Sequence, residues 1–157
     1  FIYANDELVI KEQQDIVYKP ETIITNNVSV TTTPVESPCR NYSFKQQHSV
    51  DTTALFRYSA LTFNGHKIHY DRPYAMQVEG YPGLVVHGPL LATLLMQTLQ
   101  DKYPDKIIKK FEFRAVKPVF DFNEFYICGD VQEQTAELWI EHSDGHIAMK
   151  AKLTFQE

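Results

Sequence analysis

The chain has 157 residues, of which 43% are hydrophobic and 22% charged, with a formal net charge of −5 at pH 7. This composition fits one globular domain with a hydrophobic core. The acidic balance and the lack of a basic cluster argue against a nucleic-acid surface. The longest apolar stretch, residues 84–96, is interrupted and shorter than the roughly 20 residues that span a bilayer, so we expect no membrane insertion.

The two cysteines, Cys39 and Cys128, lie far apart in the sequence and match no metal-binding spacing. We expect two reduced thiols in a cytoplasmic protein, or a mitochondrial one if the source is eukaryotic, with a disulfide bridge as the alternative. No charged and apolar leader is visible, so we expect no signal peptide.

The first 20 residues are predicted to be β-structure. Residues 8–12 alternate between the two faces of a strand, residues 15–18 are β-prone, and Lys19-Pro20 ends the segment because proline lacks an N–H. We expect a hairpin or its second half. Residues 21–40 are rich in Thr, Asn, Ser, Val and Pro without a helical period, and are predicted to be a linker.

Residues 41–157 are predicted to form the main domain, beginning with a strand over residues 41–50. A short helix over residues 51–61 follows, with Ser49 or Asp51 as its cap. Residues 63–83 show little periodicity and several Gly and Pro residues, so we expect a long irregular segment of the functional kind. Residues 89–101 carry a wide leucine stripe that predicts an enclosed helix.

The remaining sequence is predicted to be a four-stranded antiparallel meander. The strands are expected at residues 107–116, 122–131, 136–142 and 146–155, with a bulge at Gly129 and a tight turn at Asp144-Gly145. One very apolar helix needs a curved sheet to wrap it. The fold class predicted is therefore α+β, with the hotdog arrangement of an antiparallel sheet around one long helix. Such a sheet has an open edge, so we expect pairing.

Polar residues gather before the enclosed helix. Asn64, His66, His69 and Asp71 fall within eight residues, and Val86-His87-Gly88 opens the helix itself. A helix N-terminus offers unpaired N–H groups and the positive end of a dipole. We interpret this combination as a catalytic loop laid against a helix start.

Two segments make the pattern specific. Residues 56–71 read FRYSALTFNGHKIHYD and residues 80–90 read GYPGLVVHGPL. Together they closely resemble MaoC-like acyl-CoA hydratases, the family of (R)-specific enoyl-CoA hydratases, and most of all the mesaconyl-C4-CoA (3-methylfumaryl-CoA) hydratase group. The resemblance covers residues 41–157. Residues 14–18 also resemble the last strand of that family's N-terminal hotdog, so residues 1–20 are expected to be part of a second hotdog.

The resemblance implies a double-hotdog hydro-lyase acting on a CoA or acyl-carrier thioester. Such an enzyme would need no cofactor, because CoA belongs to the substrate. His69 would be the base and later the acid, since an imidazole titrates near neutral pH. The wider family places an Asp five positions before this His; here Asn64 stands there, and an amide can position water but cannot take a proton. The Gly88 N–H would hold the thioester oxygen.

Further residues are expected to contact substrate, with alternatives kept open. The substrate-binding set predicted is His66, Arg57, Tyr81, Val86 and His87. His87 could instead pack at the helix entrance, and Arg57 could be a surface charge. Asp71 is expected to fix the loop. His69 could be a loop histidine bonded to a carbonyl, and Asn64 a turn residue.

Other functions also remain open. His66, His69 and Asp71 could suggest a metal site, but no further ligand cluster exists and none is predicted. A hotdog thioesterase would usually need an acidic residue near the enclosed helix, which has none before Asp101. A non-catalytic acyl-binding or pairing subunit is the third reading. The partners expected are the acyl thioester and a second hotdog, either a second copy or another domain.

Overall fold

The computed structural model describes residues 1–16 and 41–156, and the chain divides into two units, Phe1–Thr31 and Thr32–Glu157. In the first unit, β1 (Ile2–Ala4) and β2 (Glu7–Ile10) form an antiparallel hairpin. Asn5 and Asp6 make its turn with φ values of 49° and 64°, a left-handed conformation that these two residue types tolerate. A hairpin is therefore present as expected, but its strands are residues 2–4 and 7–10, and residues 11–16 are in no strand.

The predicted β-prone piece at residues 15–18 is only partly described. Asp15 and Ile16 are not in a strand, and the other two residues lie outside the described ranges, as does the predicted linker at residues 21–40. The proposed domain boundaries at residues 20 and 40 therefore stay predictions.

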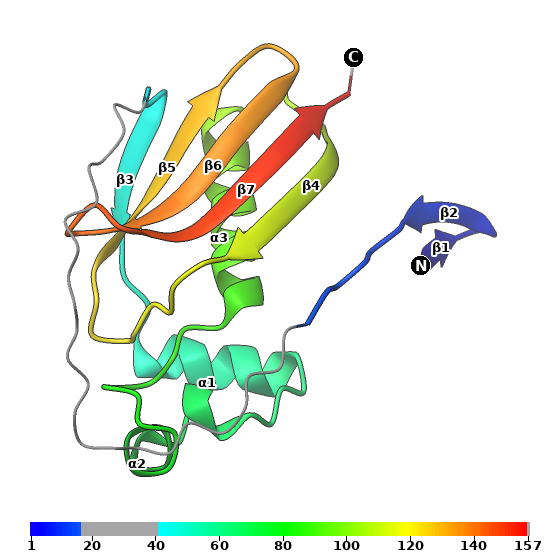
Figure 1. Ribbon diagram of the computed structural model, residues 1–157. Helices are drawn as coiled ribbons and strands as arrows, with labels where there is room; N and C mark the ends of the chain where they lie inside the picture. The colour runs from blue at the N-terminus through cyan, green and yellow to red at the C-terminus, as the bar shows by residue number, and fades with distance from the viewer. Residues whose placement is uncertain (17–40, 157) are drawn as a thin grey trace. The chain divides into compact units, whose positions relative to one another are not determined.

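The second unit is a five-stranded antiparallel sheet with one long helix against a face (Figure 1). The strand order is β3-β5-β6-β7-β4. The elements are β3 (Phe44–His48), α1 (Thr52–Leu61), the 3-10 turn η1 (Lys67–His69), α2 (Arg72–Gln77), α3 (Gly88–Lys102), β4 (Ile108–Ala115), β5 (Phe125–Val131), β6 (Thr135–His142) and β7 (Ile147–Phe155). The predicted α+β class and each predicted strand of this domain are confirmed, with ends that differ by up to three residues.

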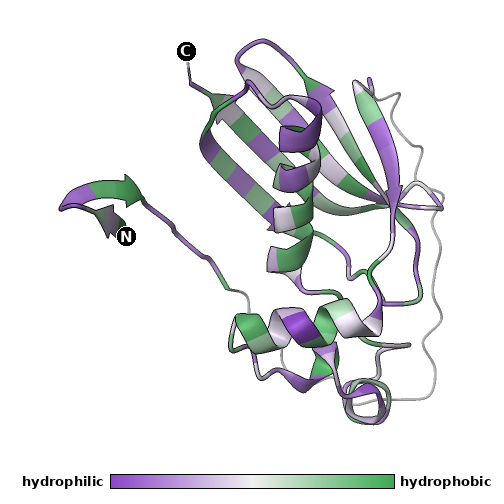
Figure 2. Cartoon of the chain, turned by 180° about the vertical axis from the view of Figure 1, so that it is seen from behind, coloured by the Kyte–Doolittle hydropathy of each residue, from purple (hydrophilic) through white to green (hydrophobic). Residues whose placement is uncertain are grey.

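The core lies between α3 and the concave face of the sheet. Apolar residues alternate with polar ones along the strands, as the banding in Figure 2 shows. Leu91, Leu95 and Leu99 of α3 belong to the same hydrophobic cluster as the buried strand residues. The fully buried side chains of this core include Leu95, Leu99, Phe125, Ile140 and Met149. The five strands curve around α3 but do not cover its N-terminal end. The loop segments cover that end.

Residues 63–83 contain more regular secondary structure than their sequence pattern predicts. This segment contains η1 and a six-residue helix, α2, so the prediction of a wholly irregular segment is wrong. Asp71 explains the difference, because its carboxylate accepts a hydrogen bond from the Tyr74 N–H at 3.1 Å and caps α2. Asp71 thus fixes the loop, as expected. Asp51 caps α1 in the same way, from the Ala54 N–H at 2.7 Å.

Gly129 is not a bulge, contrary to prediction. It pairs in regular register with Phe44 on β3 and Leu138 on β6. A Cβ at this position would lie 2.4 Å from the Phe44 ring and 2.8 Å from a Leu138 methyl group. The glycine is therefore there to let two large side chains close over the strand. Gly145, with a φ of 84°, makes the predicted turn with Asp144.

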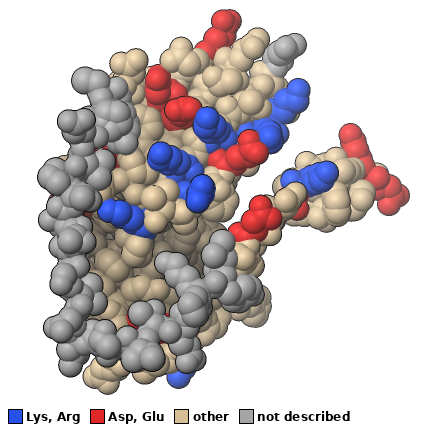
Figure 3. All heavy atoms as spheres, viewed as in Figure 1, with Lys and Arg blue, Asp and Glu red and all other residues tan. Residues whose placement is uncertain are grey.

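The outer face of the sheet carries both signs of charge, as Figure 3 shows. Ion pairs join Lys110 to Glu112 at 2.9 Å and Lys152 to Glu137 at 3.3 Å on this face. On the edge strand β4, the apolar side chain of Phe113 is 46% exposed. Across residues 1–16 and 41–156, no helix is long and apolar enough to cross a membrane.

Candidate active site

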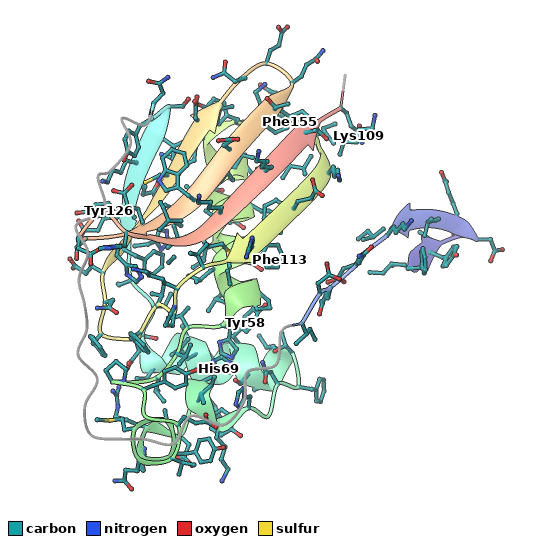
Figure 4. All side chains as sticks on the ribbon, viewed as in Figure 1. Tyr58, His69, Lys109, Phe113, Tyr126 and Phe155 are labelled. Atoms are coloured by element: carbon teal, nitrogen blue, oxygen red, sulfur yellow. The ribbon has the colours of Figure 1, made fainter. Side chains whose placement is uncertain are left out.

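His69 ends the 3-10 turn η1 and points its ring toward the start of α3. Figure 4 shows it beside Tyr58 of α1, beyond the N-terminal end of the long helix. Its side chain is buried, and Nδ1 lies 2.7 Å from the Val85 carbonyl oxygen. A carbonyl can only accept, so Nδ1 carries the proton and donates it. Nε2 is therefore the unprotonated, basic nitrogen of the neutral ring.

The carbonyl that fixes this tautomer is itself held in place. The Val85 N–H donates to the Ile68 carbonyl at 3.0 Å, and Val85 forms an isolated antiparallel bridge with Phe120. One residue earlier, the Leu84 N–H donates to the Asp121 carboxylate at 3.0 Å, and Asp121 also forms an ion pair with Arg72. Contacts on both sides thus fix the acceptor for His69.

His87 lies directly against His69. The two rings stack with centroids 3.7 Å apart and planes 19° from parallel. His87 is completely buried, and its Nε2 lies 2.8 Å from the Ser59 hydroxyl oxygen of α1. The Tyr58 ring contacts it as well, at 4.9 Å between centroids. This cluster joins α1, η1 and the start of α3 in one small volume.

The first turn of α3 has N–H groups available to a ligand. His87 is its N-cap residue but makes no side-chain capping bond, and Pro89 has no N–H. The N–H groups of Gly88 and Leu90 donate to no backbone carbonyl of the described residues. A Cβ built on Gly88 would meet nothing within 4 Å, so space adjoins this glycine. Such a terminus suits a developing negative charge.

Asn64 and His66 precede His69 on the loop. The Asn64 side-chain oxygen accepts a hydrogen bond from the His66 N–H at 3.0 Å, the Asx turn left open as an alternative from the sequence. Its amide NH2 donates to no other described residue. The His66 ring lies edge-on to His69 at 5.7 Å and is exposed. Asn64 therefore serves the turn through its oxygen and keeps donors for another group.

Burial keeps both stacked imidazoles neutral. It lowers the pKa of His69 below the usual 6.5, and the nearby His66 lowers it further, while the hydrogen bond to Val85 opposes both effects. Burial also lowers the pKa of His87 to about 4, with His69 as a second cause. At neutral pH, His69 is thus available as a base and not as a preformed acid.

The other predicted contact residues divide between the surface and the core. Arg57 lies on the exposed side of α1, without an ion pair to any described residue, and Tyr81 is half-buried beside Phe120. Val86 is buried in the core and bonds to the Val119 carbonyl, so its side chain packs inside the fold. Among residues 1–16 and 41–156, no group of three His, Cys, Asp or Glu side chains could hold a metal ion.

A family model decides the relationship. The model described as hydroxyacyl-thioester dehydratase type 2 matches residues 1–121. The chain belongs to this family. The chain is 43% identical over 151 residues to the mesaconyl-C(4)-CoA hydratase of Chloroflexus aurantiacus, a match that covers 96% of this chain and 52% of that protein. The chain is also 44% identical over 89 residues to the mitochondrial hydroxyacyl-thioester dehydratase type 2 of Schizosaccharomyces pombe. This match covers 55% of this chain and 29% of that protein.

Solved structures place the fold. The (R)-hydratase of A. caviae involved in PHA biosynthesis superposes with a TM-score of 0.65 at 19% identity, over 76% of this chain and 98% of that one. The hotdog fold expected from the sequence is thereby confirmed. The resemblance read from the sequence is confirmed separately, by the family model and the mesaconyl-C(4)-CoA hydratase relative. This dehydratase-family chain spans about half or less of the length of the two curated relatives above.

Three parts of the site were not found from the sequence. These are the Val85 carbonyl, the Ser59 hydroxyl and the ring of Tyr58. A backbone carbonyl leaves no trace in a residue pattern, so Val85 had no signal. Ser59 is four residues after Leu55, the buried position of α1, and this spacing puts a polar group on the buried side of that helix. That mismatch was the one signal available.

Proposed function

We propose that this chain carries the catalytic half-site of a hydro-lyase that adds water to, or removes it from, the Cα–Cβ bond of an acyl thioester. The observation that supports it most is the arrangement of His69: its Nδ1–H is bonded to Val85 and leaves Nε2 basic. The His69 ring stacks on His87, the residue immediately before Gly88. The Gly88 N–H donates to no backbone carbonyl of the described residues and is available to a ligand. A base and an oxyanion donor therefore lie close together.

In the hydration direction, His69 Nε2 takes a proton from water as the water oxygen bonds to Cβ. The electron pair of the double bond moves to Cα, and the negative charge spreads onto the thioester oxygen. The Gly88 N–H donates to that oxygen, helped by the dipole of α3. The protonated His69 then returns its proton to Cα, so the base becomes the acid and no net proton is consumed.

Asn64 supplies a donor and not a second base. Its free amide NH2 donates to the water oxygen and holds it near His69, while its own oxygen stays in the loop turn. His66, Arg57 and Tyr81 contact the substrate, with Arg57 offering a charge to a carboxylate or a phosphate. The reaction uses no cofactor, since CoA or the carrier group belongs to the substrate.

The substrate class follows from the relatives' names. Mesaconyl-C(4)-CoA hydratase acts on a CoA ester by its name, and hydroxyacyl-thioester dehydratase on a hydroxyacyl thioester by its name. We take an acyl-CoA or acyl-carrier thioester as the substrate of this chain. A thioesterase is disfavoured because α3 has no acidic residue before Asp101.

The site works in a pair of hotdog units. β4 ends the sheet and is eight residues long, with exposed Phe113 on it and exposed Ile107 and Val116 next to it. The opposite edge, β3, is shorter and mostly polar. An edge strand with exposed apolar side chains and unpaired backbone groups is a liability unless it is paired, so β4 is the edge we assign to a second copy or a second hotdog domain. A stable monomer at micromolar concentration in sedimentation would oppose this assignment.

A spectrophotometric assay tests the function. Enoyl-CoA thioesters, from four-carbon crotonyl-CoA to longer and carboxylated ones, are followed by loss of the conjugated absorbance. We expect His69→Ala to lower kcat/KM by about 10²–10⁴-fold while thioester binding survives. His48→Ala is the matched control, since His48 also stacks on an aromatic ring, Phe125, but lies on β3. Activity unchanged in His69→Ala would refute the mechanism.

A further inference from the structure

His87 is a buried polar residue to which the proposed chemistry assigns no step. Its exposure is 0%, and only Nε2 has a partner, the Ser59 hydroxyl at 2.8 Å. Nδ1 makes no hydrogen bond with the described residues. Burying a ring nitrogen without a partner costs free energy, which an apolar side chain of similar size would avoid. Core packing alone therefore does not explain an imidazole here.

Its neighbour, His69, needs a second point of support. The hydrogen bond from Nδ1 to Val85 holds one corner of the His69 ring. One hydrogen bond leaves the ring free to tilt about the bond direction, and a tilt moves Nε2, the reacting atom. The His87 ring lies 3.7 Å away and 19° from parallel, which is the contact that removes this freedom.

The supporting ring is itself anchored. Ser59 holds its Nε2, the His87 backbone starts α3 through the bond from the Leu91 N–H to the His87 carbonyl at 3.1 Å, and Tyr58 contacts its ring. Since burial holds the pKa of His87 at about 4, the ring is uncharged at neutral pH. A neutral ring tolerates the imidazolium that forms on His69, whereas a charged one would repel it.

We propose that His87 is a positioning residue for His69: Ser59 anchors the His87 ring at Nε2, and the face of that ring holds the His69 imidazole in its reactive plane. The proposal rests on the proposed role of His69 as the base. It assigns to Ser59 and His87 a shared task, so removing either end of their hydrogen bond should loosen the same ring.

The test is a set of four variants assayed with crotonyl-CoA, or with the panel thioester that the wild type hydrates fastest. His87→Leu removes the ring, His87→Phe keeps a ring but loses the anchor, Ser59→Ala loses the anchor alone, and the fourth variant combines the last two changes. His48→Leu is the control for loss of a stacked histidine outside the site.

We expect His87→Leu to lower kcat by about 10-fold or more, because small misplacements of a reacting group cost up to about 10²-fold, with KM within about twofold. His87→Phe and Ser59→Ala should each lower kcat by about three- to fivefold, and the combined variant by no more than either alone, since both remove one hydrogen bond. The control should retain the wild-type kcat.

A readout independent of activity is the ¹⁵N spectrum of the His69 ring at pH 7. The wild type should show a protonated Nδ1 and an unprotonated Nε2, and His87→Leu an averaged pair. The proposal is overturned if His87→Leu keeps this single tautomer with near wild-type kcat, or if the two anchor variants are additive. Should His87→Leu fail to fold, the other three variants decide. A wild type that hydrates no thioester refutes the proposed function, and the spectrum of His87→Leu then still decides the positioning.

Discussion

Acidification is expected to destabilise the fold through His87. Its side chain is fully buried and its pKa is lowered from 6.5 to about 4, first by burial and then by His69. The unfolded chain binds a proton at pH 5 that the folded chain does not. The contribution to stability is therefore fully present above pH 6.5 and is lost as the pH falls toward 4.

The size of the effect follows from the pKa difference. At 1.36 kcal/mol per pKa unit, His87 alone lowers the free energy of unfolding by about 3 kcal/mol between pH 7 and pH 4. The free energy of unfolding of a typical domain is about 5–15 kcal/mol, so this loss is a large part of it. A domain at the low end of that range would keep about half of its stability or less. His69 and His142 act in the same direction, because burial lowers their pKa values too.

A comparison with His87→Phe isolates the one residue. Urea unfolding is followed at intervals from pH 7 to pH 4 for both proteins, and the difference in unfolding free energy is plotted against pH. We expect the wild type to lose about 3 kcal/mol more than the variant over this range. A difference that stays constant within about 0.5 kcal/mol would show that His87 does not titrate in this way, and would refute the reasoning.

Three further results are expected. The acid limb of kcat/KM should fall below pH 6.5, since burial lowers the pKa of His69 and the neutral ring is the base; a limb at or above 6.5 would contradict this. Gly88→Ala should leave the unfolding free energy unchanged or raise it by up to about 1 kcal/mol, because its Cβ meets nothing. The same methyl group should raise KM, because the thioester approaches the Gly88 N–H; unchanged kinetics would contradict Gly88 as the oxyanion donor. Gly129→Ala should destabilise the fold by about 1–3 kcal/mol in urea unfolding, since its Cβ would clash with Phe44 and Leu138; an unchanged midpoint would contradict the packing role.

The amino-acid sequence determined the architecture of the main domain. Residues on one face of a strand repeat every second position, and those on one face of a helix every third or fourth, so local pattern alone located the strands and the leucine-rich α3. The preference of helix N-termini for Asp likewise located Asp51 as a cap of α1. The local pattern failed to predict α2, which is short, and it wrongly predicted a bulge at Gly129, which has a packing role. In both places the deciding contacts come from residues outside the local pattern.

The sequence also pointed to the polar loop and to His69, Asn64 and Gly88, since their types and spacing resemble a known family. It could not determine which nitrogen of His69 is basic, because that depends on the Val85 carbonyl. Nor could it reveal that Ser59, His87 and His69 form one cluster, since these residues come from three elements whose approach is set by packing around α3. Only the tertiary structure brings such groups together, because hydrogen bonds and ring stacking act over a few ångströms and not along the chain.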